Sequence, residues 1–269
     1  MTQTKLSIPV FCINLDRRPE RWNFFSKQAG LEGISVIRHS ATDGQMLSIQ
    51  DSRISPETRR RIVSKQRRAH GEINTIGAIG CTLSHVAVWD RFLKDYPDAE
   101  FALVFEDDAA IPKGALAFVE KLAPQLPKEA DLWILGYKPY KTELQPLPNQ
   151  QGPWLSPTSF WGTSAYLIRK SAISRVKEEI FPIESHLDRY VCSQQALGRL
   201  RLVVHPSLRL ANLDSGTDIQ LERCDLCGLP DVFSDEGLAV TNKYMVYGLF
   251  AYAFAITLFL GLTRNGQTS

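Results

Sequence analysis

One apolar run, residues 101–105 (FALVF), leads directly into three acids, Glu106, Asp107 and Asp108. An unbroken apolar run of this length predicts a strand that is buried on both faces, as strands are in a parallel α/β sheet. Ligands of open α/β sheets bind beyond the carboxyl ends of the strands, so the three acids are expected where a binding site belongs. The run therefore favours an α/β fold with a site at the end of this strand.

The acidic triplet predicts a divalent cation site. Neighbouring carboxylates repel one another and raise each other's pKa values unless a cation neutralises them. Mg²⁺ and Mn²⁺ prefer oxygen ligands, and one or two carboxylates can hold such an ion while it also binds substrate phosphates. A solvated acidic turn is the alternative interpretation, but the apolar residues on both sides of the triplet favour the metal.

The rest of the chain alternates between strand and helix patterns, which predicts an α/β domain over residues 1–242. A strand over residues 8–15 is followed by a helix with Asp16 as its N-cap, Pro19 in its first turn and Gly30 at its end. Residues 137–159 are rich in Pro, Gln and Gly and predict a long loop. The remaining expected elements are strands at 35–38, 132–135, 165–168 and 202–204, and helices over 81–93 and from about 170.

Charge and cysteine content limit the possible partners and compartments. The net charge of +2 is too small to indicate nucleic acid as a partner. The basic residues between 51 and 70 predict a solvated helical face, with a surface for anionic lipid or an acidic acceptor as the alternative. Five scattered cysteines predict free thiols in a reducing compartment, and no secretory signal pattern is visible near residue 1.

An uncharged apolar run lies between Lys243 and Arg264, and it predicts a helix over residues 243–263. Its length of about twenty residues is enough for a helix to cross the hydrocarbon core, and tyrosines lie at one end of it. We therefore expect a transmembrane or membrane-associated helix and a cytoplasmic protein on the cytosolic face of a membrane. A buried C-terminal helix is the alternative, because glycines and alanines make the segment only moderately hydrophobic.

Seven short segments follow one another along the chain: FCINLDRRPER (11–21), ATDG (41–44), GAIGCTLSH (77–85), FEDDA (105–109), GTSAYLI (162–168), the segment 182–188 and TDI (217–219). They resemble motifs of glycosyltransferase family 25, which includes bacterial lipooligosaccharide galactosyltransferases and collagen hydroxylysine galactosyltransferases. The first four in this order are together more specific than any one of them. The similarity covers roughly residues 8–220 and leaves out the basic segment and the C-terminal apolar run.

The resemblance implies a Rossmann-like, type A glycosyltransferase fold, a UDP-sugar donor, Mn²⁺ (or Mg²⁺) and inversion at the anomeric carbon. It implies that Asp108 ligates the metal, with Glu106 as a second ligand or a contact to the ribose or donor sugar. The transferred sugar is expected to be a hexose, galactose first, and the acceptor a hydroxyl of a lipooligosaccharide-like or other glycan. The residues expected to bind or support the donor are Asn14, Arg17, Arg21, Asp43, Gly44, Ser84 and Asp107.

The acceptor half of the reaction is less well defined by the sequence. An inverting transfer needs a general base beside the acceptor hydroxyl, and Asp188 is our candidate, with a capping or orienting role as the alternative. Ser164 stands where many relatives carry histidine, which concerns the acceptor side. His85 is expected either to orient the acidic residues or to act in catalysis, and His205 either to join the metal or to be structural.

The sequence leaves two other functions to consider. The first is that of an inactive relative, which would act as a membrane-tethered nucleotide-sugar or glycan-binding module. A metal-dependent phosphotransferase or hydrolase is disfavoured, because no Walker-type loop and no Gly-x-Ser-x-Gly elbow is present. Zinc at Cys224-x-x-Cys227 is disfavoured because a second ligand pair is missing.

Overall fold

In a computed structural model of the chain, the described residues are 8–138, 143–147, 152–213 and 217–219. All of them belong to one compact unit, Met1–Asp225. The predicted apolar helix over residues 243–263 and the Cys224-x-x-Cys227 pair lie outside the described residues. Among the helices within the described ranges, none is long and apolar enough to cross a membrane.

A six-stranded sheet organises this unit, with the strand order β2-β1-β3-β7-β4-β8. Five of the strands run parallel to one another, and β7 alone runs antiparallel between β3 and β4. The carboxyl ends of the parallel strands therefore meet at one edge of the sheet, together with the amino end of β7. The strands are β1 (Val10–Asn14), β2 (Ile37–Ser40), β3 (Phe101–Glu106), β4 (Leu132–Gly136), β7 (Ala165–Arg169) and β8 (Leu202–Val203).

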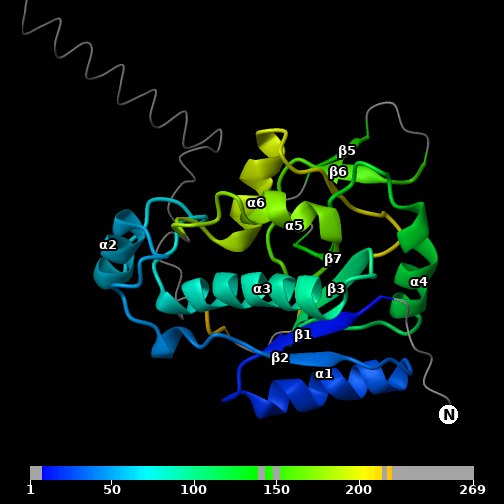
Figure 1. Cartoon of the computed structure of the whole chain (residues 1–269), viewed down its shortest axis with the longest axis horizontal. Helices are drawn as coiled ribbons and strands as arrows, with labels where there is room; N and C mark the ends of the chain where they lie inside the picture. The colour runs from blue at the N-terminus through cyan, green and yellow to red at the C-terminus, as the bar shows by residue number, and fades with distance from the viewer. Residues whose placement is uncertain (1–7, 139–142, 148–151, 214–216, 220–269) are drawn as a thin grey trace, which may run out of the picture. The chain divides into compact units, whose positions relative to one another are not determined.

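Helices cover both faces of the sheet, as Figure 1 shows for α1 and α3. One face packs against α1 and α4, and the other packs against α3, α5 and α6. A smaller apolar cluster joins α2 to the first turns of α3. The helices are α1 (Pro19–Leu31), α2 (Pro56–Ser64), α3 (Ile76–Asp95), α4 (Ala115–Leu122), α5 (Ile173–Lys177) and α6 (Leu187–Ala196), with short 3-10 turns at Gly44–Met46, Ala123–Gln125 and Lys170–Ala172.

The apolar runs of the sequence explain this three-layer arrangement. Successive side chains of a strand point to opposite faces. In β1, Val10 and Cys12 enter the cluster under α1 and α4, whereas Phe11 and Ile13 enter the cluster under α3. Because helices cover both faces, a central strand needs apolar residues at every position, and β3 is buried from Phe101 to Phe105. The α/β fold class is therefore confirmed.

Two local predictions differ from the structure. Helix α1 begins after Arg18, and Asp16 does not cap it, because the Asp16 carboxylate instead accepts hydrogen bonds from Arg38 and Ser40 of β2. Within the predicted loop 137–159, short antiparallel strands form at β5 (Leu144–Pro146) and β6 (Leu155–Pro157). The β6 strand is anchored by the bridge between Leu155 and Val204, a pairing across about fifty residues of sequence that composition does not reveal.

The basic segment contains α2, a short helix with much of its surface exposed. Ser55 caps it by accepting a hydrogen bond from the Thr58 N–H. Several of its arginines pair with acids, among them Arg60 and Arg61 with Glu57. Residues 56, 60, 63 and 64 are exposed, as a solvated helical face requires, while Arg59 and Arg61 are half-buried; the alternative of a lipid- or acceptor-binding surface stays a prediction.

Candidate functional site

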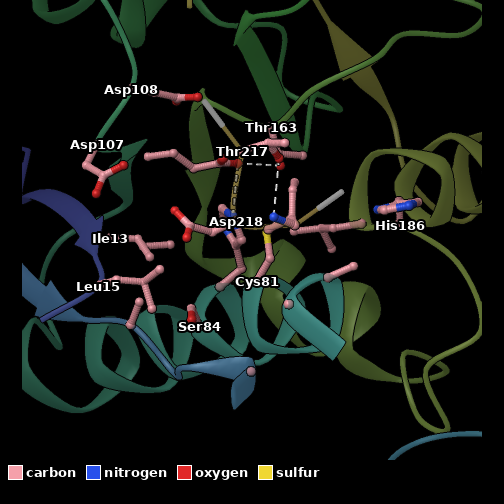
Figure 2. A pocket seen from close by; sticks show the side chains of 18 of the residues that line it. Ile13, Leu15, Cys81, Ser84, Asp107, Asp108, Thr163, His186, Thr217 and Asp218 are labelled. Atoms are coloured by element: carbon pink, nitrogen blue, oxygen red, sulfur yellow. Dashed lines mark hydrogen bonds and ion pairs between the residues drawn. The ribbon is translucent and has the colours of Figure 1, made fainter. Parts of the chain in front are cut away.

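A cavity of about 580 Å³ lies at the edge of the sheet where the parallel strands end. It is bordered by the residues that follow β1, β2, β3 and β4, by the first half of α3 and by the residues before β7. Figure 2 shows Cys81 and Ser84 on the α3 side of the cavity, with Asp107 and Asp108 on another side. Of the predicted site residues, all but Asn14 line it: Arg17, Arg21, Asp43, Gly44, Ser84, Glu106, Asp107, Asp108 and Asp188.

Asp107 is turned toward the N-terminal part of the site. Its Oδ2 accepts a hydrogen bond of 2.6 Å from Asn14 Nδ2, and its Oδ1 lies 3.4 Å from Arg21 Nη1. Burial raises the pKa of Asp107, while Asn14 and Arg21 oppose that rise by favouring the ionised form. Asn14 therefore lies behind the cavity wall, where it holds Asp107 in place.

Glu106 is turned in the opposite direction, toward β7 and α3. Its Oε1 accepts a hydrogen bond of 2.7 Å from Thr163 Oγ1 and lies 3.3 Å from His85 Nε2. Burial alone would raise the pKa of Glu106, but contacts with His85 and Thr163 outweigh burial and hold it below its usual value. Glu106 is therefore an ionised carboxylate with one side fixed by two protein partners.

His85 is fully buried and is oriented by a chain of hydrogen bonds. Trp89 Nε1 donates to Tyr166 Oη at 2.9 Å, and Tyr166 Oη lies 2.8 Å from His85 Nδ1. Because indole can only donate, the tyrosine hydroxyl accepts from Trp89, and its own proton can be given to Nδ1. In that arrangement Nε2 carries the ring proton and faces Glu106. This geometry favours the orienting role that was one of the two predictions for His85.

Asp108 differs from the other two acids because it has few partners. Its Oδ1 is buried without a hydrogen-bond partner among the described residues, and its Oδ2 accepts only a long bond of 3.4 Å from Asn212 Nδ2. Burial, followed by the charges of Glu106 and Asp107, raises the pKa of Asp108 to about 7. A buried carboxylate oxygen without a partner is unfavourable, and a cation at this point would relieve it.

Asn212 is a site residue that the sequence analysis missed. Backbone bonds place it beside the triplet, since Leu213 N–H donates to the Asp108 carbonyl and Ala110 N–H to the Ala211 carbonyl. Its amide oxygen accepts a hydrogen bond of 2.7 Å from Ser164 Oγ. Ser164 therefore contacts the segment that lies beside the acidic triplet, and the expectation that its departure from the family pattern concerns the acceptor side stays a prediction.

The arginines after β1 are held by acids from distant segments. Arg17 donates to Asp43 at 2.7 Å and to Asp218 at 2.8 Å. Arg21 Nη1 lies 3.6 Å from Asp218 in addition to its contact with Asp107. Asp218 lies in the TDI motif that was noted without a role, and its partners now give it one. The two arginines are thus gathered on one wall of the cavity, although carboxylates occupy them here.

Close packing at the start of α3 brings these segments together. A Cβ atom on Gly77 would lie 2.0 Å from the Asp218 carbonyl oxygen, and one on Gly44 would lie 2.5 Å from the Ile76 carbonyl oxygen. Ser84 fixes the same region, since its Oγ donates to the Gly80 carbonyl and accepts from the Thr42 N–H. Ser84 was predicted to bind the sugar donor, but its hydroxyl already donates one hydrogen bond and accepts another within the fold.

Asp188 lies in the first turn of α6 and lines the cavity. Its Oδ2 accepts a hydrogen bond of 2.8 Å from the Gly162 N–H, and its Oδ1 accepts one of 2.7 Å from the Arg189 N–H. These bonds connect α6 to the segment that precedes β7, as the orienting alternative requires. Each oxygen keeps lone-pair capacity beyond its one bond, so the role of general base stays a prediction.

Two sets of side chains could hold a metal. The first is Asp108 with Glu106, and the unpartnered Asp108 Oδ1 fits a hard, oxygen-seeking ion. The second is Cys81, His85 and Glu106, whose ligand atoms lie within 4.8 Å of one another. Burial and nearby acids raise the pKa of Cys81 well above its usual value, which disfavours the thiolate that a soft metal needs. The geometry therefore fits Mn²⁺ or Mg²⁺ at Asp108 better.

His205 does not take part in either set. It does not line the cavity, and its ring packs against Trp133, Trp154 and Phe118. Its Nδ1 accepts a hydrogen bond from the Ser207 N–H within its own turn. Of the two predictions for His205, the structural one fits this position.

Known proteins of one family are similar in sequence to most of this unit. Residues 7–191 match the family described as glycosyltransferase family 25 (LPS biosynthesis protein). A glycosyltransferase 25 family member of Drosophila pseudoobscura pseudoobscura is 27% identical over 200 residues, covering 69% of this chain and 30% of that protein. One from Anopheles gambiae is 35% identical over 105 residues, covering 39% of this chain and 17% of that protein.

A human relative is named inactive glycosyltransferase 25 family member 3; it is 29% identical over 190 residues, or 66% of this chain and 31% of that protein. The chain thus spans less than a third of the length of these relatives. Among solved structures, A197 from STIV has a TM-score of 0.40 at 13% identity and covers 80% of this chain and 100% of that one. A glycosyltransferase involved in glycosylation of the major capsid of PBCV-1 also has a TM-score of 0.40, at 8% identity, covering 78% and 94%.

The motifs that carried the resemblance line one cavity, and the family match spans more than half of the sequence. On this basis the chain belongs to glycosyltransferase family 25.

Proposed function

We propose that the protein is a metal-dependent, inverting glycosyltransferase of the type A fold that moves a hexose, galactose first, from a UDP-sugar to a glycan hydroxyl. The observation that carries the proposal is the Asp108 carboxylate, buried at the end of β3 with one oxygen unpartnered. The cavity around it, at about 580 Å³, lies within the range of about 300–1,000 Å³ that is common for small-molecule sites.

Asp108 and Glu106 would hold the divalent cation, which would act as a Lewis acid toward the charge that develops on the departing UDP. Asp107 is not proposed as a ligand, because its carboxylate is already held between Asn14 and Arg21, whereas Asp108 Oδ1 has no hydrogen-bond partner among the described residues. Arg17 and Arg21 would exchange part of their carboxylate contacts for diphosphate oxygens, which offer the same bidentate geometry. The charge of the donor thus replaces the charge that Asp43 and Asp218 now supply to these arginines.

On the acceptor side, Asp188 would accept the proton of the attacking hydroxyl. The hydroxyl oxygen forms the new bond to the anomeric carbon from the face opposite UDP, and UDP leaves with the electron pair of the broken bond. The Gly162 and Arg189 N–H groups fix the direction of the carboxylate while lone pairs remain for the acceptor proton.

The acceptor is proposed to be a lipooligosaccharide-like or other glycan, and residues 243–263 are proposed to hold the protein at the cytosolic face of a membrane. The uncharged run over residues 244–263 supports the second proposal. Fractionation of the full chain and of a chain ending at residue 242 tests it. If both forms stay soluble and monomeric, the membrane proposal fails.

The main test measures UDP release by the purified full-length protein with a panel of UDP-sugars and glycan acceptors, with and without Mn²⁺. Asp108→Ala is expected to abolish Mn²⁺-dependent release, whereas Asp98→Ala, which removes an exposed acid that does not line the cavity, is expected to leave it unchanged. Undiminished turnover in Asp108→Ala would refute the assignment.

A second outcome points to the alternative function. The human relative is named inactive, so an inactive member has a precedent in the family. Such a module would release no UDP with any donor or acceptor, yet Mn²⁺ and UDP would still raise its melting temperature. A thermal-shift screen of nucleotides with and without Mn²⁺ therefore separates the two functions.

A further inference from the structure

We propose that Asn212 is a third protein ligand of the divalent cation, and that Ser164 lets its amide turn between a metal-free and a metal-bound orientation. The inference rests on the proposed function, because it concerns the cation at Asp108. It assigns a binding role to a residue 104 positions away in sequence from the acid it contacts.

Position is the first support. The strand-like contact between residues 109 and 212 and the bond from Leu213 N–H to the Asp108 carbonyl hold the two backbones side by side. Asn212 is an exposed residue that lines the cavity, and its Nδ2 is 3.4 Å from Asp108 Oδ2. Oxygen ligands at neighbouring corners of an octahedral ion with bonds of about 2.1 Å are about 3.0 Å apart. The spacing of the two side chains is therefore close to that of two ligands of one ion.

The weakness of the present contact is the second support. A hydrogen bond of 3.4 Å is long compared with the usual value of about 2.9 Å, so it does little to hold Asp108 in one orientation. The other oxygen of Asp108 has no partner among the residues described. An asparagine whose purpose was to hold this carboxylate would be expected to bond it more closely.

Ser164 supplies the third support. Its hydroxyl donates to Asn212 Oδ1 at 2.7 Å and is itself almost fully buried. A hydroxyl can donate or accept, so a half-turn of the amide keeps this bond, with Nδ2 then donating to Ser164 Oγ. The same half-turn directs Oδ1 toward Asp108. In the present orientation the amide donates to the carboxylate, and after the half-turn its carbonyl oxygen would join the carboxylate as a ligand of the ion.

The test uses full-length protein and Mn²⁺ alone, so that no sugar or turnover is needed. Free Mn²⁺ is counted by electron paramagnetic resonance, and the number of water molecules on bound Mn²⁺ is measured by ¹⁷O-water relaxation. For Asn212→Ala we expect a five- to twentyfold weaker Mn²⁺ affinity and one additional bound water. Asn212→Asp, which keeps a ligand oxygen, is expected to bind Mn²⁺ at least as tightly as the wild type with no additional water.

Asn23→Ala is the matched control, because Asn23 is an exposed asparagine on α1 that does not line the cavity. A purely positioning role for Asn212 would weaken binding without changing the water count, and that result would overturn the inference. An affinity within twofold of wild type in Asn212→Ala would overturn it as well. If Asp108→Asn binds Mn²⁺ as tightly as wild type, the cation site of the proposed function itself fails, which is a different result.

Discussion

Replacement of Asp108 by Asn is expected to stabilise the metal-free protein at neutral and alkaline pH. The substitution keeps the shape of the side chain and its acceptor for Asn212 but removes the negative charge. Burial, Glu106 and Asp107 raise the Asp108 pKa from its ordinary 3.8 to about 7, so the folded protein holds a proton that the unfolded chain releases. Ionisation of this carboxyl therefore favours the unfolded state.

The sign and the pH range follow from this difference. Well below pH 4 the carboxyl is protonated in both the folded and the unfolded state, so it does not change the free energy of unfolding. As the pH rises from about 4 to 7, the free energy of unfolding falls progressively, because only the unfolded chain ionises this group. Above pH 7 the group is ionised in both states and the loss of stability is constant. A rise from 3.8 to about 7, at about 1.4 kcal/mol for each pH unit, sets an upper limit of about 4 kcal/mol. Because the three acids titrate together, we expect about 1–3 kcal/mol, or a melting temperature about 2–10 °C higher.

The assay is urea and thermal unfolding of wild type and Asp108→Asn between pH 4 and 8.5 in the presence of a chelator. The stability gap between them should be absent near pH 4, grow toward pH 7 and stay level above it. Added Mn²⁺ should stabilise the wild type at pH 8, less so below pH 7 where protons compete for the carboxylate, and should not stabilise the variant. Equal stability of the two proteins at pH 8, or a gap that does not change with pH, would refute the reasoning.

Three further predictions concern residues in and around the cavity. Gly77→Ala should lower the free energy of unfolding by about 1–3 kcal/mol and weaken UDP binding, because the added Cβ would displace the Asp218 backbone. Gly30→Ala should not destabilise the protein, because a Cβ at residue 30 would have no atom within 4 Å. Equal effects of the two substitutions in a thermal-shift assay would contradict this. Tyr166→Phe should cost about 1–3 kcal/mol in urea unfolding, because it leaves a buried indole N–H and a ring nitrogen unpaired, and an unchanged midpoint would be inconsistent with the hydrogen-bond chain. Asp188→Asn should lower kcat for transfer at least a hundredfold with unchanged UDP affinity if Asp188 is the base; a kcat within a few-fold of wild type would leave it only the orienting role.

The sequence by itself determined the fold class, the donor-side motifs and the place of the acidic triplet. These features are local: an unbroken apolar run such as residues 101–105 signals a strand covered on both faces, and the residue after a strand end lies at the edge of the sheet whatever the rest of the chain does. The resemblance to the family, rather than a strand end, grouped Arg17, Asp43 and Ser84 in one expected donor-binding region before any contact between them was known.

Only the tertiary structure decided how the three acids differ and which distant residues touch them. Asp107 is directed to Asn14, Glu106 to His85 and Thr163, and Asp108 to Asn212, through contacts between residues 21 to 104 positions apart. No periodicity or spacing encodes such contacts, because they arise from the order in which strands and loops pack beside one another. The same dependence on packing explains why Asp16 failed as a helix cap: an arginine and a serine from β2, absent from its local sequence, bind its carboxylate.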